Sequence, residues 1–151
     1  MPDIFDLIED DEDMDDTELD TNEEDDEDDD TDDEVIPWEF GIDFNTGQLT
    51  GTLVSGLEAV KVWVWLALKT ARYRFMIYSW EYGSELETLI GTGYSEEFTA
   101  ARAQKFVEEC LYENPYITNL TDFSASFEDD VLQLGFSLET DFGEEEIQFN
   151  V

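Results

Sequence analysis

Apolar and polar residues alternate in the segment that follows Pro37, and this period of two predicts a half-buried strand. The apolar set is Trp38, Phe40, Ile42 and Phe44, and it alternates with Glu39, Gly41, Asp43 and Asn45. Asn45-Thr46-Gly47 predicts a hairpin turn, because glycine accepts a positive φ. The run from Leu49 to Leu53 then predicts the returning strand.

The pattern changes to a helical period after Ser55, which we expect to cap a helix formed by GLEAVKVWVWLALKT. A step of ~100° per residue separates two faces. The apolar face holds Leu57, Val60, Trp63, Val64, Ala67, Leu68 and Ala71, and the other holds Glu58, Lys61, Trp65, Lys69 and Arg72. Trp65 thus lies on a charged stripe, where it either packs under lysine stems or anchors an interface.

Residues 73–82 are rich in aromatics and predict an extended strand with Tyr78, Trp80 and Tyr82 on one face. Gly83 permits a sharp corner. Ser84-Glu85-Leu86-Glu87 fits a capping box that starts a short helix, which Gly91 ends. We expect Trp80 in the core and Tyr82, next to the corner, in an interface.

A longer helix is predicted from Ser95, with Glu96 and Glu97 complementing its positive end. Asn114-Pro115 ends it. Its core stripe is Ala103, Phe106, Val107, Cys110 and Leu111. Cys110 belongs to that stripe, so we expect it to be buried and inert.

The remaining residues predict a three-strand meander with turns at 129–130 and 141–144. The inward sets are Phe123, Ala125 and Phe127; Leu132, Leu134, Phe136 and Leu138; and Ile147, Phe149 and Val151. We therefore predict an α+β fold, in which an antiparallel sheet (N-terminal hairpin plus C-terminal meander) is packed by two main helices and one short helix. The last strand is expected to present a free edge that accepts an added strand.

Charge divides the chain into two predicted parts, a disordered acidic N-terminal arm over 1–34 and a domain over 35–151. The chain has 42 acidic and 6 basic residues, and residues 3–34 hold 22 of the acidic ones, which leaves 42 − 22 = 20 for the domain. Such an arm cannot bury enough apolar surface to order itself. Ile4, Phe5, Leu7 and Ile8 form a short apolar segment in it that is expected to dock on the domain or on a partner.

The acidic charge of the domain disfavours nucleic acid and anionic membrane as partners, since both are recognised through Lys and Arg. No apolar run approaches the ~20 residues of a membrane span. A single cysteine excludes an intrachain disulfide and favours a reducing cytoplasm.

Catalytic chemistry is sparse, because the chain has no histidine and one cysteine. No cofactor or metal is expected. Glu81, Glu85 and Glu87 leave open a carboxylate-dependent muramidase. Another alternative is an assembly adaptor whose acidic arm binds a basic partner.

Three blocks of sequence are distinctive: IDFNTGQLTG, SGLEAVKVWVWLALKT and RYRFMIYSWEYGSELETLIG. They resemble the XkdS-like baseplate proteins of contractile phage tails and tail-like particles. The resemblance covers about Phe40 to Val151. That group is similar to the sheath initiators, whose motif positions here hold Thr70, Arg74, Gly83, Ser84 and Leu86.

The resemblance implies a structural, non-enzymatic baseplate component that joins the wedge core and templates the first sheath ring by strand addition. Where sheath initiators carry Glu-Pro-Arg at the wedge contact, this chain has Asn114-Pro115-Tyr116. The implied partners are baseplate wedge proteins and the tail sheath protein, with tube or hub proteins as further candidates, in about six copies around the tail. The implied location is the virion tail baseplate, assembled in the bacterial host cytoplasm.

Overall fold

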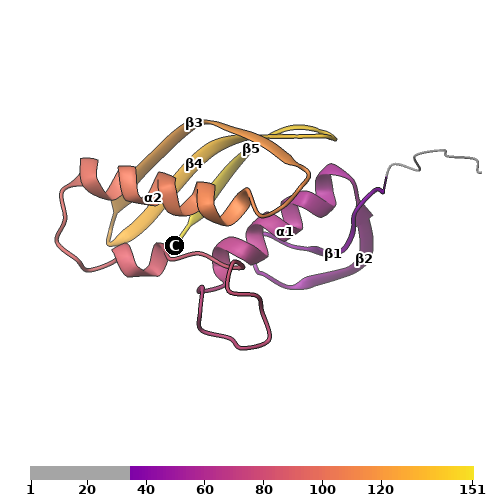
Figure 1. Cartoon of the computed structure of the whole chain (residues 1–151), viewed down its shortest axis with the longest axis horizontal. Helices are drawn as coiled ribbons and strands as arrows, with labels where there is room; N and C mark the ends of the chain where they lie inside the picture. The colour runs from indigo at the N-terminus through magenta and orange to yellow at the C-terminus, as the bar shows by residue number, and fades with distance from the viewer. Residues whose placement is uncertain (1–34) are drawn as a thin grey trace, which may run out of the picture. The chain divides into compact units, whose positions relative to one another are not determined.

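The computed structural model describes residues 35–151, and Figure 1 shows the arrangement of this domain. The acidic arm and its apolar segment lie outside the described residues. The elements are β1 (Trp38–Ile42), β2 (Leu49–Ser55), α1 (Leu57–Lys69), the 3-10 helix η2 (Leu86–Leu89), α2 (Glu96–Leu111), β3 (Ile117–Glu128), β4 (Val131–Thr140) and β5 (Gly143–Asn150). The predicted α+β class is confirmed, with the hairpin and the meander forming two separate antiparallel sheets.

The meander has β4 at its centre, between β3 and β5. Asp129 and Asp130 both adopt positive φ in the turn that joins β3 to β4, as a tight hairpin requires. The predicted inward set of β4 is confirmed, since Leu132, Leu134, Phe136 and Leu138 are all buried. The alternate residues of β5 remain exposed, so this sheet has one apolar and one polar face.

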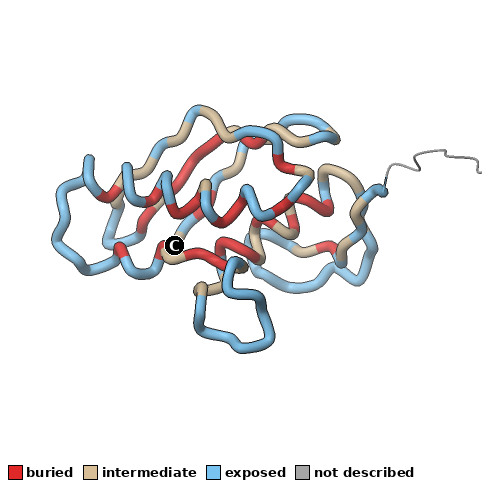
Figure 2. The backbone as a smooth tube through the Cα atoms, in the orientation of Figure 1, coloured by how far each residue is buried: buried red, intermediate tan, exposed pale blue. Residues whose placement is uncertain are grey.

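The main core lies between that apolar face and the two long helices. In Figure 2, buried backbone runs along α1, α2 and β4. The predicted core stripe of α2 is confirmed in full: Ala103, Phe106, Val107, Cys110 and Leu111 are buried. The Ser95 cap is also confirmed, because its side chain accepts a hydrogen bond from the Phe98 N–H at 3.3 Å.

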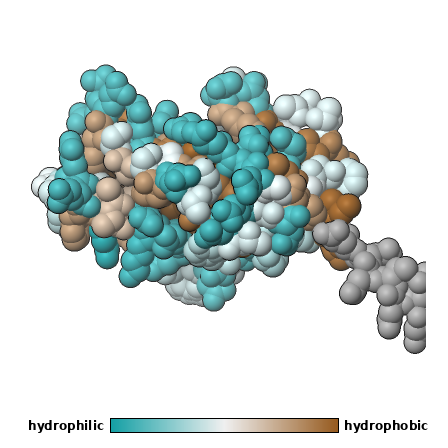
Figure 3. Space-filling view, turned by 90° about the horizontal axis from the view of Figure 1, so that it is seen from above, coloured by the Kyte–Doolittle hydropathy of each residue, from teal (hydrophilic) through white to brown (hydrophobic). Residues whose placement is uncertain are grey.

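The hairpin is confirmed, but its predicted inward face is wrong. Trp38 is 65% exposed and Phe40 is 62% exposed, and Phe40 lies opposite the exposed Leu53. In Figure 3, hydrophobic residues gather at the end of the domain where the described chain begins. Alternation predicted the strand correctly, yet it could not tell which face α1 would cover.

Helix α1 has buried residues inside the main core and others outside it. Val60 and Val64 join the main core as predicted. Ala59 and Val62 are also buried but lie outside that core cluster, on a helix that packs against β1 and β2. The predicted Ser55 cap is wrong, because Ser55 is the last residue of β2 and Gly56 occupies the cap position without a side-chain hydrogen bond.

The predicted strand over 73–82 is wrong, because this segment forms a loop of turns. Figure 2 shows the loop as an exposed excursion that leaves the end of α1 and returns to η2. The loop is closed at its base by a parallel bridge between Ala71 and Ser84. Tyr78, Trp80 and Tyr82 therefore share no strand face.

The predicted capping box is also wrong. The Ser84 hydroxyl donates a hydrogen bond to the Leu68 carbonyl at 2.9 Å, which lies near the C-terminal end of α1. Glu87 accepts from Arg74 at 2.9 Å, and η2 starts without a side-chain cap. The serine thus satisfies the end of the preceding helix, whose last carbonyls have no partner within the helix.

Gly83 allows the base of the loop to close for two reasons. It adopts a positive φ of 102°, and its lack of a side chain lets the backbone of Thr70 and Arg72 come close to it. A Cβ at this position would lie 2.7 Å from the Thr70 carbonyl oxygen and 3.0 Å from the Arg72 nitrogen. Both of those atoms belong to the backbone, so they cannot move aside without opening the bridge.

We predict that Gly83→Ala lowers the free energy of unfolding by about 3 kcal/mol or more, because it adds a backbone clash to the strain of a positive φ. Gly91→Ala is the matched control, since Gly91 has a φ of 75° with nothing within 4 Å of its Cβ position. That control should cost about 1 kcal/mol. Urea denaturation followed by tryptophan fluorescence measures both, and equal losses would contradict the close-approach argument.

Candidate partner-binding surfaces

The first surface is the outer edge of β5. The register from Gly143 to Asn150 has no irregularity, whereas β3, the other edge strand of this sheet, shifts register twice and has Asp122 at a φ of 53°. Irregular edges resist pairing with another chain. The edge of β5 is therefore the better template of the two.

The backbone groups that point outward from β5 follow from the alternation of an antiparallel pair. The Val151 N–H donates inward to the Leu132 carbonyl at 2.9 Å. The Asn150 carbonyl, one residue earlier, points outward and accepts from Lys69 Nζ at 2.8 Å. Counting back by two, the outward groups belong to Glu144, Glu146, Gln148 and Asn150.

A groove of about 720 Å³ runs beside this edge, between β5, α1 and the hairpin turn. Trp65 and Phe44 contribute aromatic walls, and Lys61 and Lys69 contribute positive charge. Trp65 packs close to the turn, because a Cβ at Gly47 would lie 3.0 Å from its ring. Lys69 Nζ lies 5.9 Å from the Trp65 ring centroid, which agrees with packing under a lysine stem, while Trp65 also lines the groove.

Two lysines of α1 reach across to β5. Lys61 Nζ lies 3.0 Å from Glu145 and 3.3 Å from Glu58. Burial alone lowers the pKa of Lys61, but its hydrogen bonds to Glu145 and Glu58 outweigh that effect and raise the pKa above its ordinary value. Lys69 Nζ lies 4.7 Å from the Phe149 ring centroid, so both lysines hold β5 against α1.

The second surface is the aromatic loop over 71–84. Its exposed apolar residues are Tyr73, Phe75, Met76, Ile77, Tyr78 and Trp80. Trp80 is 80% exposed, which makes its predicted core placement wrong. Tyr82 is instead half-buried, with its ring centroid 6.0 Å from that of Trp63, and burial raises the pKa of its phenol.

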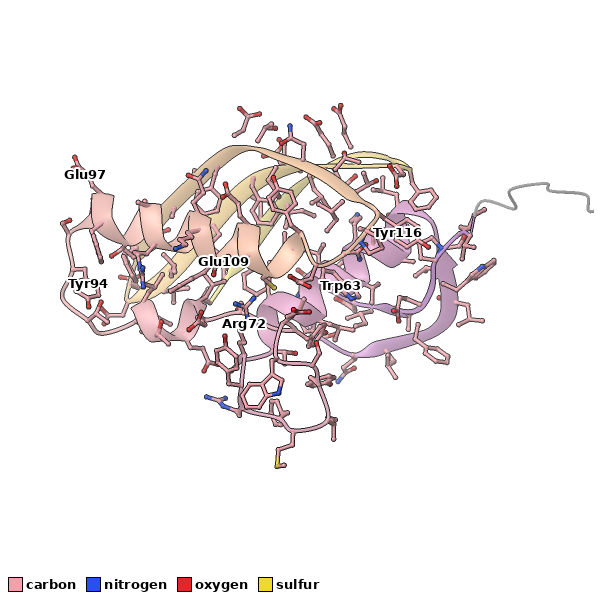
Figure 4. The ribbon with its side chains drawn as sticks, viewed as in Figure 1. Trp63, Arg72, Tyr94, Glu97, Glu109 and Tyr116 are labelled. Carbon is pink, nitrogen blue, oxygen red and sulfur yellow. The ribbon has the colours of Figure 1, made fainter. Side chains whose placement is uncertain are left out.

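The base of this loop is organised by Arg72, whose side chain is only 10% exposed. Its guanidinium donates to the Glu81 carbonyl at 3.2 Å and lies 3.8 Å from both Glu85 and Glu109. Figure 4 shows Arg72 directed toward Glu109 on α2. With Arg74 paired to Glu87, the arginines engage two of the three carboxylates that the muramidase alternative requires.

The third surface surrounds Asn114-Pro115-Tyr116. The Asn114 side chain accepts from the Tyr116 N–H at 3.0 Å, which fixes a turn after α2. The Tyr116 hydroxyl donates to the Val35 carbonyl at 2.8 Å. A hollow of about 250 Å³ beside the turn is lined by Trp63, Pro37 and Glu39, among others.

The predicted binding residues fall into three groups. Trp65 lies in the groove, with Ile147, Phe149 and Val151 on the inward side of the strand that borders it. Ser84 and Leu86 are buried and Tyr82 is half-buried, so with Gly83 they shape the loop base rather than offer contact area. Arg74, Asn114, Pro115 and Tyr116 lie elsewhere on the domain, and the structure does not bring all twelve predicted residues together.

Sequence reasoning missed Phe44 and Lys61 as parts of the groove. The sequence places Phe44 in the apolar set of the first strand and Lys61 on the charged stripe with Trp65, but it does not bring the two together. Only the folded arrangement of the hairpin turn against α1 places the Phe44 ring 5.7 Å from Lys61 Nζ. No spacing in the sequence signals that contact.

No helix among residues 35–151 is long and apolar enough to cross a membrane.

The family model for the contractile injection system sheath initiator matches residues 38–143. The chain therefore belongs to the sheath initiator family. It is similar to the phage-like element PBSX protein XkdS of Bacillus subtilis (strain 168), with 34% identity over 110 residues, which cover 72% of this chain and 78% of that relative.

Family membership confirms the resemblance found in the sequence and assigns the chain a structural role in a phage tail or baseplate. The family match ends at Gly143, the first residue of β5. The family match therefore covers the α1 and hairpin sides of the groove but not the β5 edge beyond Gly143.

Cys110 is buried at the centre of the core rather than in any of these surfaces. Burial raises the pKa of its thiol from 9.0 to about 12, against a smaller opposing effect of Arg72. The predicted burial of Cys110 is confirmed. Because the thiolate is the reactive form, the burial and the raised pKa both disfavour reaction of the native thiol at neutral pH.

We predict that Ellman's reagent at pH 8 leaves Cys110 unmodified in the native protein and modifies it fully in denaturant. The raised pKa means that the protonated thiol stabilises the fold below the unfolded pKa near 9.0, and that this contribution is lost as the pH rises toward 12. The unfolding free energy of wild type should thus fall more steeply over that window than that of Cys110→Ala. Rapid native labelling would show that the core opens at Cys110.

Proposed function

We propose that this protein initiates the contractile sheath by accepting a strand from the first ring of sheath subunits along the outer edge of β5. The observation that carries the proposal is the uninterrupted register of β5 beside a groove of about 720 Å³. An edge with unpaired N–H and C=O groups supplies affinity to an added strand, and an adjoining groove supplies selection among side chains.

The charges around the edge favour a specific partner over self-association. Glu144 and Glu146 are exposed on β5 itself, and carboxylates on an edge oppose pairing between copies of the same chain. Lys69 occupies the last outward carbonyl at Asn150. An added strand of complementary charge would pair from Glu144 to Gln148 and displace Lys69 only if it extends further.

A deletion of the last strand would be a poor test of this proposal. Phe149 is 5% exposed and belongs to the core, and Val151 bonds to β4. Deleting residues 145–151 would therefore unfold the sheet as well as remove the edge. A single change at an outward position is the cleaner experiment.

We further propose that the Asn114-Pro115-Tyr116 turn joins the domain to the wedge. The turn is rigid, since its backbone is fixed by the Asn114 side chain. The hollow beside it offers Trp63 and Pro37 to an apolar side chain. Pro115→Gly, which keeps the side-chain contacts of Asn114, should weaken incorporation of the protein into baseplates without preventing its folding.

We predict that Gln148→Pro gives baseplates and tubes that assemble without sheath. The Gln148 N–H points outward, so proline removes a donor that β4 does not use and costs the monomer only about 1 kcal/mol. The measurement is electron microscopy of particles completed with the variant, alongside its melting temperature.

Gln148→Ala is the matched control, because it removes the side chain and keeps the N–H. It should support full-length sheath. If Gln148→Pro particles also carry full-length sheath, strand addition at β5 is not how the sheath begins.

A further inference from the structure

A cleft of about 480 Å³ lies between the aromatic loop and the C-terminal half of α2. Tyr73 and Trp80 form its loop side, with ring centroids 5.9 Å apart. Tyr112, at the end of α2, adds an exposed ring. The cleft shares no lining residue with the groove beside β5.

The charged residues of the cleft are mainly acidic. Its carboxylates are Glu81, Glu108, Glu109 and Glu113, and its cations are Arg72 and Lys105. Among residues 35–151, neither Glu81 nor Glu113 has an ion-pair partner within 4.0 Å. The two cations therefore leave an excess of negative charge in the cleft.

The internal cations do not saturate Glu109 either. Its oxygens lie 3.8 Å from Arg72 and 3.6 Å from Lys105, beyond the 2.7–2.9 Å of a charge-assisted hydrogen bond. Arg72 is fixed in place by the loop backbone, and its Nε has no hydrogen-bond partner in the described structure. Arg72 cannot swing closer without leaving Glu81.

Exposed aromatic rings beside unsatisfied carboxylates are the combination that recognises an organic cation. The ring faces attract the cation, and the carboxylates accept its N–H donors. An acidic segment would be repelled by the four glutamates, and a purely apolar one would desolvate them without replacing their hydrogen bonds.

We propose that this cleft binds an arginine or lysine side chain presented by a segment of a neighbouring protein, with the cation over Trp80 and its donors on Glu81 and Glu109. Tyr73 is not the cation's platform, because the Arg72 guanidinium already lies 5.9 Å from the Tyr73 ring centroid. The site is independent of strand addition at β5. It assigns a role to the exposed loop, which holds Trp80 in place over the cleft through the Gly83–Ser84 closure.

The test uses the full chain and two probes, acetyl-glycyl-arginyl-glycinamide and its glutamyl counterpart, at about 150 mM salt to suppress diffuse attraction. Binding is followed by amide chemical shifts in NMR. Trp80→Ala and Glu81→Gln are the site variants. Glu97→Gln and Tyr94→Ala are matched controls, because both residues are exposed at the opposite end of α2 (Figure 4).

The arginyl peptide should shift amides around Tyr73, Trp80 and Tyr112, and the glutamyl peptide should not. Each site variant should weaken binding by about 3- to 5-fold, the loss expected for one exposed cation–π contact or charge-assisted bond, and each control should leave it unchanged. Shifts spread over all acidic surfaces, or equal losses in Glu97→Gln, would overturn the proposal. Guanidinium ion alone producing the same shifts and affinity would show that no peptide segment is recognised.

Discussion

The last carbonyl groups of α1 accept no hydrogen bond from within the helix. Ser84, which follows the aromatic loop, donates hydrogen bonds to the carbonyls at this end of the helix. Ser84 donates its hydroxyl to Leu68 and its N–H to Thr70, while its own carbonyl accepts from Arg72. These contacts tie η2 to the end of α1 and fix both ends of the aromatic loop. Buried polar groups are costly when unpaired, so the position of the loop is set by this closure rather than by apolar burial.

Because the hydrogen bonds of Ser84 fix the base of the loop, aromatic residues on the two sides of that base have different roles. Trp63 and Tyr82 pack edge to face beneath the loop and connect it to the core. Tyr73 and Trp80 pair on the outside, where their rings remain exposed. The loop therefore keeps large apolar residues at its surface without relying on them for its own shape, which suits a part that contacts other proteins.

Sequence patterns predicted correctly those helices and strands in which the apolar residues of the repeating pattern are also the buried residues. The β4 alternation and the α2 stripe are confirmed residue by residue, because each element has one face on the core. Predictions failed where local signals competed with tertiary contacts. Ser84 and Glu87 fit a capping box, yet the free carbonyls of α1 and the Arg74 side chain bind them instead.

The outcome for the hairpin has a related cause. Alternation in β1 identified a strand, and α1 packs against that strand. The buried residue of the strand is Gly41, while Trp38 and Phe40 remain exposed. The sequence indicated Trp65 and the last strand as binding residues, but it could not predict the β5 groove itself, because the groove joins the hairpin turn, one face of α1 and that strand. Such surfaces follow from packing, which no single stretch of sequence encodes.

Because the register of β5 is regular, the way in which an added strand aligns with it decides which side chains of that strand face the groove. An added strand that pairs with Glu144, Glu146 and Gln148 places every second side chain beside Trp65 and the others on the open polar face. A slip by one residue exchanges the two sets completely. Under the proposed strand addition, a chain of suitable composition but the wrong alternation would present polar groups to the aromatic wall. The edge would then distinguish incoming segments by the order of their residues as well as by their content.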